Sequence, residues 1–443
     1  MSSDIQIEGG HRLEGEIRIQ GAKNAALPIV AATLLTSDEC VLENVPYIED
    51  IRVMGAVLES LGARIERDSR HRLIIRADNI RTCRTPDELT RRLRGSFLVM
   101  GPLLARFGQA EAAHPGGCAI GTRPVSVDVK GFALMGAEVA QANGHYAAKA
   151  PHLEGRRMTL DYPSHTGTEN LLMAACLARG VTVIENASVE PEVIDLANFL
   201  RAMGARISGA GTGIIEVEGV ERLHGAVYRV MPDRLEAGTF AIAAAITGGS
   251  VVLERVIPQH LRALNSKLAE AGVGIREEGQ RVIVTGAERL QAVDIRTFPY
   301  PGFPTDLQAP FGALMTQAQG ESAIHETMYD DRLLYVGELR KMGAQIRVQG
   351  QTALITGPTP LRGAPVRALD IRSGAAVILA GLVAEGQTTV SDMWYVDRGY
   401  ERLDERLASL GARIERIAGQ SPMSGGGEPR RGLNRGEVCS LDR

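Results

Sequence analysis

The sequence lacks a strong charge of either sign and any long apolar run. Its 49 basic and 53 acidic residues leave a formal net charge of -4, so it has no overall basic field of the kind that binds nucleic acid. No apolar run reaches the roughly 18 residues that a helix needs to cross a bilayer, and the N-terminal residues Met1 to Asp4 lack the features of a signal peptide. We therefore expect a cytoplasmic protein with no membrane span and no nucleic-acid partner.

Cysteine and histidine are too scattered to indicate a metal site or a disulfide framework. The nine histidines show no HExxH spacing and no Walker lysine motif is present. The glycines at 209–213 precede no helix, so we expect a hairpin turn there instead of a dinucleotide loop. The sequence thus predicts neither a metal nor a cofactor. The cysteines are odd in number and widely spaced, which favours reduced thiols: Cys40, Cys83, Cys118, Cys176 and Cys439.

What is present is a globular composition, 44% hydrophobic and 23% charged, and one local pattern written six times. Each copy has an apolar residue, a glycine and a strand-like run in which apolar and polar residues alternate. We expect each glycine to end a helix in the left-handed conformation, where it carries no Cβ penalty, and to lead into a strand. The glycines are 74, 68, 68, 71 and 68 residues apart: Gly62, Gly136, Gly204, Gly272, Gly343 and Gly411.

A second helix is expected in each repeat, about 25 to 30 residues upstream of this glycine. These segments are rich in alanine and leucine on nearly every face, which predicts helices buried against sheets. The clearest examples occupy residues 169–179, 237–247, 375–385 and 98–107. Cys176 lies inside the first of them and is expected to be a core residue. Each repeat is thus a two-helix α/β module.

The six modules are expected to form two bodies of three. A single array would leave sheet faces uncovered at its ends unless atypical caps were present, and the sequence contains none. We predict a two-domain α/β fold with its active site in the cleft between the domains. The expected bodies are residues 22–230 and residues 231–418, and residues 1–21 join the second body as an N-terminal strand. Residues 419–443 are expected to form a flexible tail.

A candidate catalytic thiol, Cys118, lies in the glycine-rich segment from Pro115 to Pro124. Arg123 follows five positions later, and a nearby guanidinium favours the thiolate over inert sulfur. Exposed backbone amides and a guanidinium also suit phosphate or carboxylate. The alternative is a surface turn with a solvated arginine.

Other candidate cations are spread along the chain. Lys23 and Asn24 follow a strand-like run at the start of an apolar helix, whose N-terminus adds positive charge that attracts an anion. The alternative for Lys23 is an exposed lysine. Four arginines recur near the ends of repeat elements, and each could equally be a surface salt-bridge partner. Together with Lys23 and Arg123 they would supply the cations that a small, multiply charged substrate needs: Arg94, Arg332, Arg372 and Arg398.

Asp306 follows a proline and precedes an apolar helix, in the segment Phe303-Pro304-Thr305-Asp306. Its carboxylate could cap that helix, which is a structural role. It could instead be a general base within reach of a substrate hydroxyl. The sequence leaves both interpretations open.

Taken together and in this order, these features closely resemble the UDP-N-acetylglucosamine 1-carboxyvinyltransferases of the enolpyruvyl transferase family. The resemblance covers roughly residues 4–418. It rests on the six modules, the Cys118 loop and four short motifs: Gly21-Ala22-Lys23-Asn24, Pro232-Asp233-Arg234, Phe303-Pro304-Thr305-Asp306 and Asp397-Arg398-Gly399-Tyr400.

The resemblance implies an inside-out α/β barrel fold with two domains that close on a sugar nucleotide. It implies transfer of enolpyruvate from phosphoenolpyruvate to the 3-hydroxyl of UDP-N-acetylglucosamine through a tetrahedral intermediate, with release of phosphate. This is the first step of peptidoglycan precursor synthesis. The reaction needs no metal, and no obligate protein partner is evident.

The resemblance also implies residue roles. Cys118 would protonate the enol methylene and Asp306 would take the hydroxyl proton. Lys23, Arg123 and Arg398 would hold the phosphate, with Arg94 close by and with Arg332 and Arg372 nearer the donor carboxylate. Five residues match positions near the sugar nucleotide or the closing cleft: Asn24, Ser164, Thr168, Glu192 and Asp233.

Three positions depart from the family pattern. The family usually has aspartate and histidine where this chain has Ser126 and Asp128, and often lysine in the loop that here contains Tyr162. These changes fall where uracil and diphosphate should lie, so an enolpyruvyl transferase with another acceptor, such as a uridine nucleotide, remains the alternative. The shikimate 3-phosphate enzyme is not expected to carry the Cys118 loop. A catalytically silent repeat protein is the rival from another class.

Overall fold

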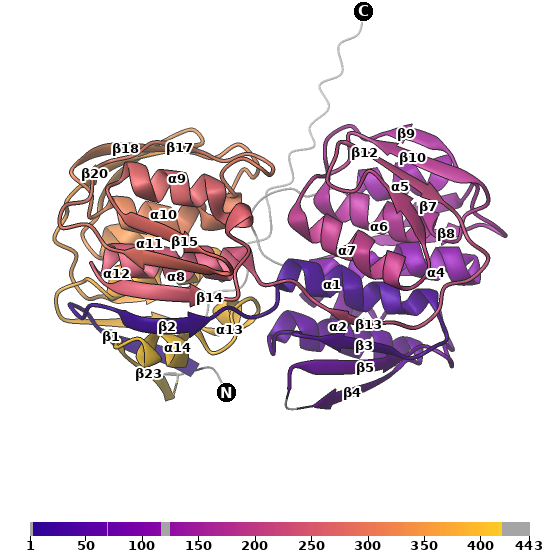
Figure 1. Cartoon of the computed structure of the whole chain (residues 1–443), viewed down its shortest axis with the longest axis horizontal. Coiled ribbons are helices and arrows are strands. Elements are labelled where there is room, and N and C mark those ends of the chain that lie inside the picture. The colour runs from indigo at the N-terminus through magenta and orange to yellow at the C-terminus, as the bar shows by residue number, and fades with distance from the viewer. Residues whose placement is uncertain (1–2, 69, 117–124, 419–443) are drawn as a thin grey trace, which may run out of the picture.

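Buried apolar side chains form two separate cores. The computed structural model describes residues 3–68, 70–116 and 125–418. One core is built by residues between Ala22 and Met231, and the other by residues 5–19 together with residues between Leu235 and Ala412. We refer to these bodies as the N-lobe and the C-lobe. The domain boundaries that we propose lie within a few residues of the ends of these cores. Figure 1 shows the two lobes side by side.

The N-lobe has three small sheets. In the first, the strand order is β13 (Val227–Arg229), β3 (Cys40–Glu43), β5 (Arg72–Arg76) and β4 (Arg64–Asp68). The second has the order β6 (Gln109–Ala113), β8 (His145–Lys149) and β7 (Glu138–Ala142). The third has the order β11 (Arg206–Ser208), β12 (Ile214–Glu218), β10 (Val181–Glu185) and β9 (Arg157–Thr159). Strands β11 and β12 pair antiparallel, which confirms the predicted hairpin at 209–213.

The C-lobe repeats this plan with three four-stranded sheets. The first is ordered β15 (Gly274–Glu278), β16 (Arg281–Thr285), β14 (Ser250–Glu254) and β2 (Glu14–Arg18). The second is ordered β17 (Ile295–Arg296), β18 (Gly320–His325), β20 (Thr352–Gly357) and β19 (Gln345–Gln349). The third is ordered β21 (Pro365–Arg367), β22 (Gln387–Ser391), β1 (Ser3–Glu8) and β23 (Arg413–Ala418). The N-terminal strands β1 and β2 thus lie in sheets whose other strands come from the C-lobe.

The helices fall into an inner and an outer set. The inner helices are buried over most of their surface: α1 (Lys23–Ala32), α4 (Met100–Phe107), α6 (His165–Ala175), α8 (Arg234–Ile246), α10 (Gln308–Met315) and α12 (Ile371–Gly381). The outer helices each keep an exposed face: α2 (Glu49–Leu61), α5 (Ser126–Leu134), α7 (Pro191–Ala202), α9 (Arg262–Glu270), α11 (Tyr335–Lys341) and α14 (Leu403–Ser409). The short helices are α3 (Asp87–Arg92) and α13 (Trp394–Asp397).

In both lobes the inner helices contact one another. Helix α10 packs against α8 and α12, and α6 packs against α4 and α1. Helices therefore occupy the interior and sheets lie outside, as the predicted inside-out α/β arrangement requires. The inner helices pack on sheets, as predicted, and also on one another, because alanine and glycine let neighbouring helix backbones approach closely. A Cβ placed on Gly101 of α4, for instance, would come within 2.3 Å of the backbone carbonyl oxygen of Asn170 in α6.

The six repeat glycines all adopt the left-handed conformation, with φ between 93° and 114°. Each follows an outer helix and precedes a strand, so the predicted helix, glycine and strand pattern is confirmed. The boundaries of two inner helices were predicted wrongly. Helices α6 and α12 begin and end about four residues before the predicted segments at 169–179 and 375–385. Their N-caps Ser164 and Asp370 fix the start, and a turn separates each helix from the glycine.

Candidate active site

The two segments that cross between the lobes are hydrogen-bonded to each other. The Ala22 N–H donates to the Met231 carbonyl at 2.8 Å, and the Asp233 N–H donates to the Gln20 carbonyl at 2.8 Å. Helix α1 begins directly after the first crossing and α8 directly after the second. The N-termini of an N-lobe helix and a C-lobe helix are thereby placed together at the lobe boundary.

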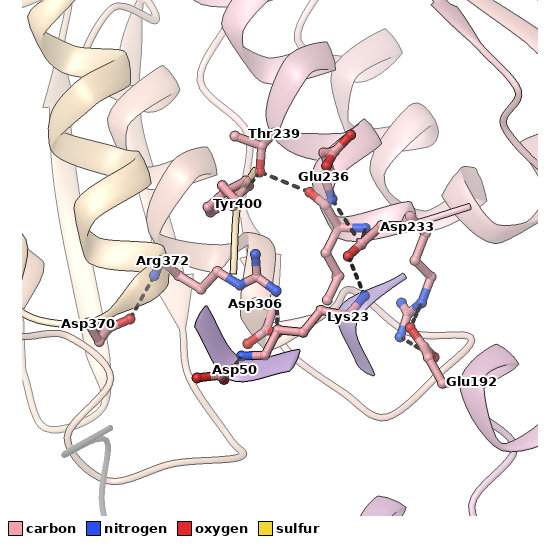
Figure 2. Close-up of polar contacts among 12 residues, drawn as sticks. Lys23, Asp50, Glu192, Asp233, Glu236, Thr239, Asp306, Asp370, Arg372 and Tyr400 are labelled. Carbon is pink, nitrogen blue, oxygen red and sulfur yellow. Dashed lines mark hydrogen bonds and ion pairs between the residues drawn. The ribbon is translucent and has the colours of Figure 1, made fainter. Parts of the chain in front are cut away.

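Asp233 connects these two helix ends. Its Oδ1 caps α8 by accepting the N–H groups of Leu235 at 2.7 Å and Glu236 at 3.1 Å. Its Oδ2 accepts the N–H of Lys23 at 3.1 Å (Figure 2). One carboxylate therefore satisfies backbone donors on both sides of the boundary, which fixes where the Lys23 side chain starts.

Lys23 is buried, contrary to the exposed alternative, and shares a carboxylate with an arginine from the other lobe. Its Nζ lies 2.7 Å from Asp50 Oδ2, and Figure 2 shows the side chain reaching to Asp50. Asp50, in the first turn of α2, also accepts a hydrogen bond at 2.8 Å from Nε of Arg398, which directly follows α13. Cations from both lobes thus meet at one anion.

The electrostatics of Asp50 follow from this position. Burial by itself would raise the pKa of its carboxyl group, but Lys23 and Arg398 outweigh burial and the pKa is lowered. The carboxylate therefore stays ionised between the two cations. Sequence reasoning did not identify Asp50, because an acidic residue in the first turn of a helix is ordinary there.

Asp306 lies between two buried arginines. Its carboxylate forms ion pairs with Arg332 and, at 3.0 Å, with Arg372. Burial alone would raise the pKa of Asp306, but Arg372 and Arg332, with a smaller contribution from Lys23, hold the pKa well below its usual range. Because Lys23 contributes, this cluster is electrostatically joined to the one around Asp50.

The helix-capping interpretation of Asp306 was wrong. Asp306 is the middle residue of a short 3-10 helix (Thr305–Leu307) that leads into α10, and its side chain makes no cap. The 3-10 turn satisfies the first backbone donors, since the Gln308 N–H donates to the Thr305 carbonyl. The carboxylate is therefore left to face the arginines.

Asp370 and Tyr400 hold Arg372 in place. Asp370 caps α12 by accepting the backbone N–H of Arg372 at 2.8 Å, and the guanidinium lies over the Tyr400 ring, 5.1 Å from its centroid. The Tyr400 hydroxyl in turn forms a hydrogen bond of 2.7 Å with Thr239 Oγ1 of α8. These contacts orient the guanidinium toward Asp306 (Figure 2).

Glu192 belongs to a third ion cluster across the lobe boundary. Its Oε1 lies 3.0 Å from Nε of Arg234, the first residue of α8, and Arg234 also pairs with Glu190 at 2.5 Å. The Tyr300 N–H donates to Glu190 Oε1 at 2.9 Å. The sequence motif contained Arg234 without giving it a role. The ion pair between Glu192 of α7 and Arg234 of α8 depends on the tertiary structure, and the sequence gave no sign of it.

Arg94 lines a small pocket of the N-lobe. It begins a 3-10 helix (Arg94–Val99) and lines the pocket together with Pro115, Val125 and the buried Asp128. Asp128 accepts a hydrogen bond from Asn170 at 2.8 Å. Asp128 is one of the three positions that depart from the family pattern, so this departure lies in the pocket of Arg94.

The remaining predicted site residues occupy three different settings. Ser164 caps α6 through the Gly167 N–H at 3.1 Å, and Thr168 accepts the Ser188 N–H at 3.0 Å. Asn24 is half-buried in the first turn of α1. Cys118 and Arg123 lie outside the described residues, but the segments that flank them, at Pro115 and Val125, meet in the Arg94 pocket.

Two absences hold for the part of the chain that the structure describes. Within those residues, no group of three or more histidine, cysteine or acidic side chains is arranged to hold a metal ion. No helix there combines the length and apolarity needed to traverse a bilayer.

The burial of Asp128 predicts a pH effect on stability. Burial raises the pKa of Asp128 to about 6, so its ionisation costs stability as the pH rises from about 4 to about 6. Asp128→Asn removes this cost and keeps an acceptor for Asn170. We expect the variant to gain up to about 3 kcal/mol relative to the wild type between pH 4.5 and pH 7.5, measured by urea unfolding. Asp161→Asn, at an exposed position, should leave the pH dependence unchanged, and an unchanged dependence in Asp128→Asn would contradict the prediction.

The fold and this site define a class of protein. Residues 7–407 match the family model of EPSP synthase (3-phosphoshikimate 1-carboxyvinyltransferase). The crystal structure of the enolpyruvyl transferase NikO from Streptomyces tendae is similar, with a TM-score of 0.84 and 25% identity, over 95% of this chain and 100% of that one. EPSP synthase from Acinetobacter baumannii shares the fold, with a TM-score of 0.73 and 19% identity, over 94% of this chain and 100% of that one.

Sequence relatives narrow this class. The chain is 50% identical to UDP-N-acetylglucosamine 1-carboxyvinyltransferase 1 of Caldanaerobacter subterraneus subsp. tengcongensis, over 94% of this chain and 100% of the relative. It is also 50% identical to UDP-N-acetylglucosamine 1-carboxyvinyltransferase of Dichelobacter nodosus, over 93% of this chain and 99% of the relative. The chain therefore belongs to the UDP-N-acetylglucosamine 1-carboxyvinyltransferases, within the EPSP synthase family.

Proposed function

We propose that this protein transfers the enolpyruvyl group of phosphoenolpyruvate to the 3-hydroxyl of UDP-N-acetylglucosamine and releases phosphate. Its place is then the first step of peptidoglycan precursor synthesis, and we infer that it acts in the cytoplasm. The observation that carries the proposal is the meeting of Lys23 and Arg398, from opposite lobes, at Asp50, beside a carboxylate held by two arginines.

The donor carries a phosphate and a carboxylate, so it needs cations on both sides. In this proposal Lys23 and Arg398 turn from Asp50 to the donor phosphate, joined by Arg123, with Arg94 close by. Arg332 and Arg372 form ion pairs with Asp306 and would bind the donor carboxylate. Guanidinium groups suit both anions because their paired N–H donors match two oxygens.

The chemistry needs an acid and a base. The acceptor oxygen forms a bond to C2 of the donor while its proton passes to Asp306, and C3 receives a proton from Cys118. This gives a tetrahedral intermediate that still carries the phosphate. In the second step the Cys118 thiolate left by the addition takes a proton back from C3, which expels phosphate and restores the double bond. Cations already in place around the departing phosphate stabilise the negative charge that develops there.

The acceptor would be bound mainly by residues at the lobe boundary and in the N-lobe. Asp233 and Glu192 lie where the lobes meet, and both are held by ion pairs or helix N–H groups. The others come from the starts of α1 and α6. These are Asn24, Ser164 and Thr168.

An acceptor screen tests the proposal. Phosphate release from phosphoenolpyruvate is measured with UDP-N-acetylglucosamine, with uridine nucleotides that lack the acetylated sugar, and with shikimate 3-phosphate. We expect release with UDP-N-acetylglucosamine. Release with another uridine nucleotide alone would assign a different acceptor, for which Ser126, Asp128 and Tyr162 would be the first positions to consider. Binding of donor and acceptor without release would support a silent protein.

The Cys118 loop predicts sensitivity to an epoxide. A thiolate opens the ring of a small epoxide phosphonate such as fosfomycin and forms a thioether, while the phosphonate occupies the site of the donor phosphate. We expect time-dependent loss of activity and a covalent adduct on Cys118, detected by mass spectrometry of the digested protein. Cys118→Ala should form no adduct, and donor added in excess should slow adduct formation. Full activity after prolonged exposure would contradict a reactive thiol at this position.

A further inference from the structure

Glu401 of the C-lobe is held by two residues of the N-lobe. Its Oε2 accepts the backbone N–H of Tyr47 at 2.8 Å, and its Oε1 lies 2.9 Å from His71 Nε2. Glu401 is only 8% exposed. Because the hydrogen-bond partners of this buried carboxylate lie in the opposite lobe, the contact fixes the distance between the lobes at this point.

On the N-lobe side of this contact, Tyr47 and His71 hold each other in place. The His71 ring stacks on the Tyr47 ring with centroids 4.3 Å apart, and the backbone N–H of His71 donates to the Tyr47 hydroxyl at 3.2 Å. His71 adopts the left-handed backbone conformation, with φ of 58°. That conformation is uncommon for residues other than glycine and persists where surrounding contacts determine it.

The contact is adjacent to the cation cluster of the site. Glu401 follows Arg398 by three residues, and Tyr47 precedes Asp50 by three. The same two chain segments are therefore joined twice: Arg398 donates to Asp50 at 2.8 Å, and Tyr47 donates to Glu401. The two links have opposite polarity, since the C-lobe supplies the cation in one and the anion in the other.

Neighbouring carboxylates of the same segment face their own lobe. Asp397 and Asp404 both pair with Arg416 of β23, and the exposed Glu405 pairs with Arg402. Glu401 differs from them because its partners come from residues 47 and 71. Its role is therefore not explained by holding the C-lobe together.

We propose that Glu401, gripped by Tyr47 and His71, is a positioning residue that sets Arg398 at the donor phosphate. The proposal rests on the function proposed above, and it adds a requirement. Donor affinity depends on a contact that touches neither substrate. When the contacts of Glu401 with Tyr47 and His71 are lost, the 398–401 segment can move relative to α2. The Arg398 guanidinium then no longer stays where the phosphate binds.

The test compares Glu401→Ala with Glu405→Ala, a control that removes an exposed carboxylate four residues further on. The steady-state parameters of phosphate release are measured for both substrates. Glu401→Ala should raise the KM for phosphoenolpyruvate about tenfold, as expected for loss of a hydrogen bond to a charged group, and should change the KM for UDP-N-acetylglucosamine by less than about twofold. His71→Asn, which suits the left-handed backbone but lacks the ring, should give a smaller effect in the same direction. Glu405→Ala should behave as the wild type.

A double-mutant cycle separates positioning from general loss of structure. In the Arg398→Ala background, Glu401→Ala should have no further effect on kcat/KM for the donor, because Glu401 acts through Arg398. Additive effects, equal changes in both KM values, or an unchanged donor KM would overturn the proposal. Urea midpoints show whether each variant is folded, and if Glu401→Ala is not, His71→Asn supplies the same cycle. If the wild type releases no phosphate, the proposed function fails first, independently of Glu401.

Discussion

Asp306→Asn is expected to lower kcat by a factor of about 100 to 10,000, the usual contribution of a general base. The amide has nearly the same shape but cannot take a proton from the acceptor hydroxyl. Phosphate release at saturating concentrations of both substrates measures the effect. Asp331→Asn, which changes an exposed carboxylate next to Arg332, should leave kcat unchanged.

The low pKa of Asp306 affects how kcat and kcat/KM depend on pH. In the free protein Arg372 and Arg332 hold this pKa well below its usual range, which makes the carboxylate a weak base. A donor carboxylate that binds these arginines would draw their charge away and raise the pKa of Asp306. We therefore expect the acid limb of kcat, which reports the complex, at a higher pH than the acid limb of kcat/KM, which reports the free protein.

Two outcomes would contradict the general-base role. A kcat within about threefold of the wild type in Asp306→Asn would exclude it. A loss of activity accompanied by a large drop in the urea midpoint would instead indicate that the ion pairs of Asp306 mainly stabilise the fold, because two buried guanidinium groups would be left without their carboxylate.

Lys23→Met is expected to lower kcat/KM for phosphoenolpyruvate by a factor of about 100 or more, equivalent to about 3 kcal/mol or more of lost binding in the transition state. The substitution keeps the unbranched, apolar part of the side chain and removes the ammonium group that lies 2.7 Å from Asp50. Asp50 then keeps Arg398 as its cationic partner, so less positive charge is free for the donor phosphate. Steady-state kinetics with the donor varied measure the effect.

Two further variants sharpen this prediction. Lys23→Arg should not restore full activity, because a planar guanidinium does not fit a site built around a compact ammonium group. Lys130→Met, at an exposed lysine paired with Asp161, is the matched control and should match the wild type. Normal donor kinetics in Lys23→Met would show that the lysine serves only to neutralise Asp50.

Local features of the structure could be predicted from the sequence because they depend on neighbouring residues. A glycine after a helix adopts the left-handed conformation for steric reasons, and all six repeat glycines do so. Lys23 begins α1 as predicted. Helix boundaries were less certain where caps and not glycines fix them, as at Ser164 and Asp370.

The pairing of charges was decided by the tertiary structure. The sequence identified Lys23, Asp306 and Arg398 as candidates, but it gave no sign that Asp50 joins the first to the last or that Glu401 binds the N-lobe. Arg398 and Asp50 are 348 residues apart, and Glu401 and Tyr47 are 354 apart. Charged side chains of this kind are common on surfaces. Only the burial of both lobes' cores brings these groups out of water and to within hydrogen-bond distance of each other, where their charges determine what the site can bind.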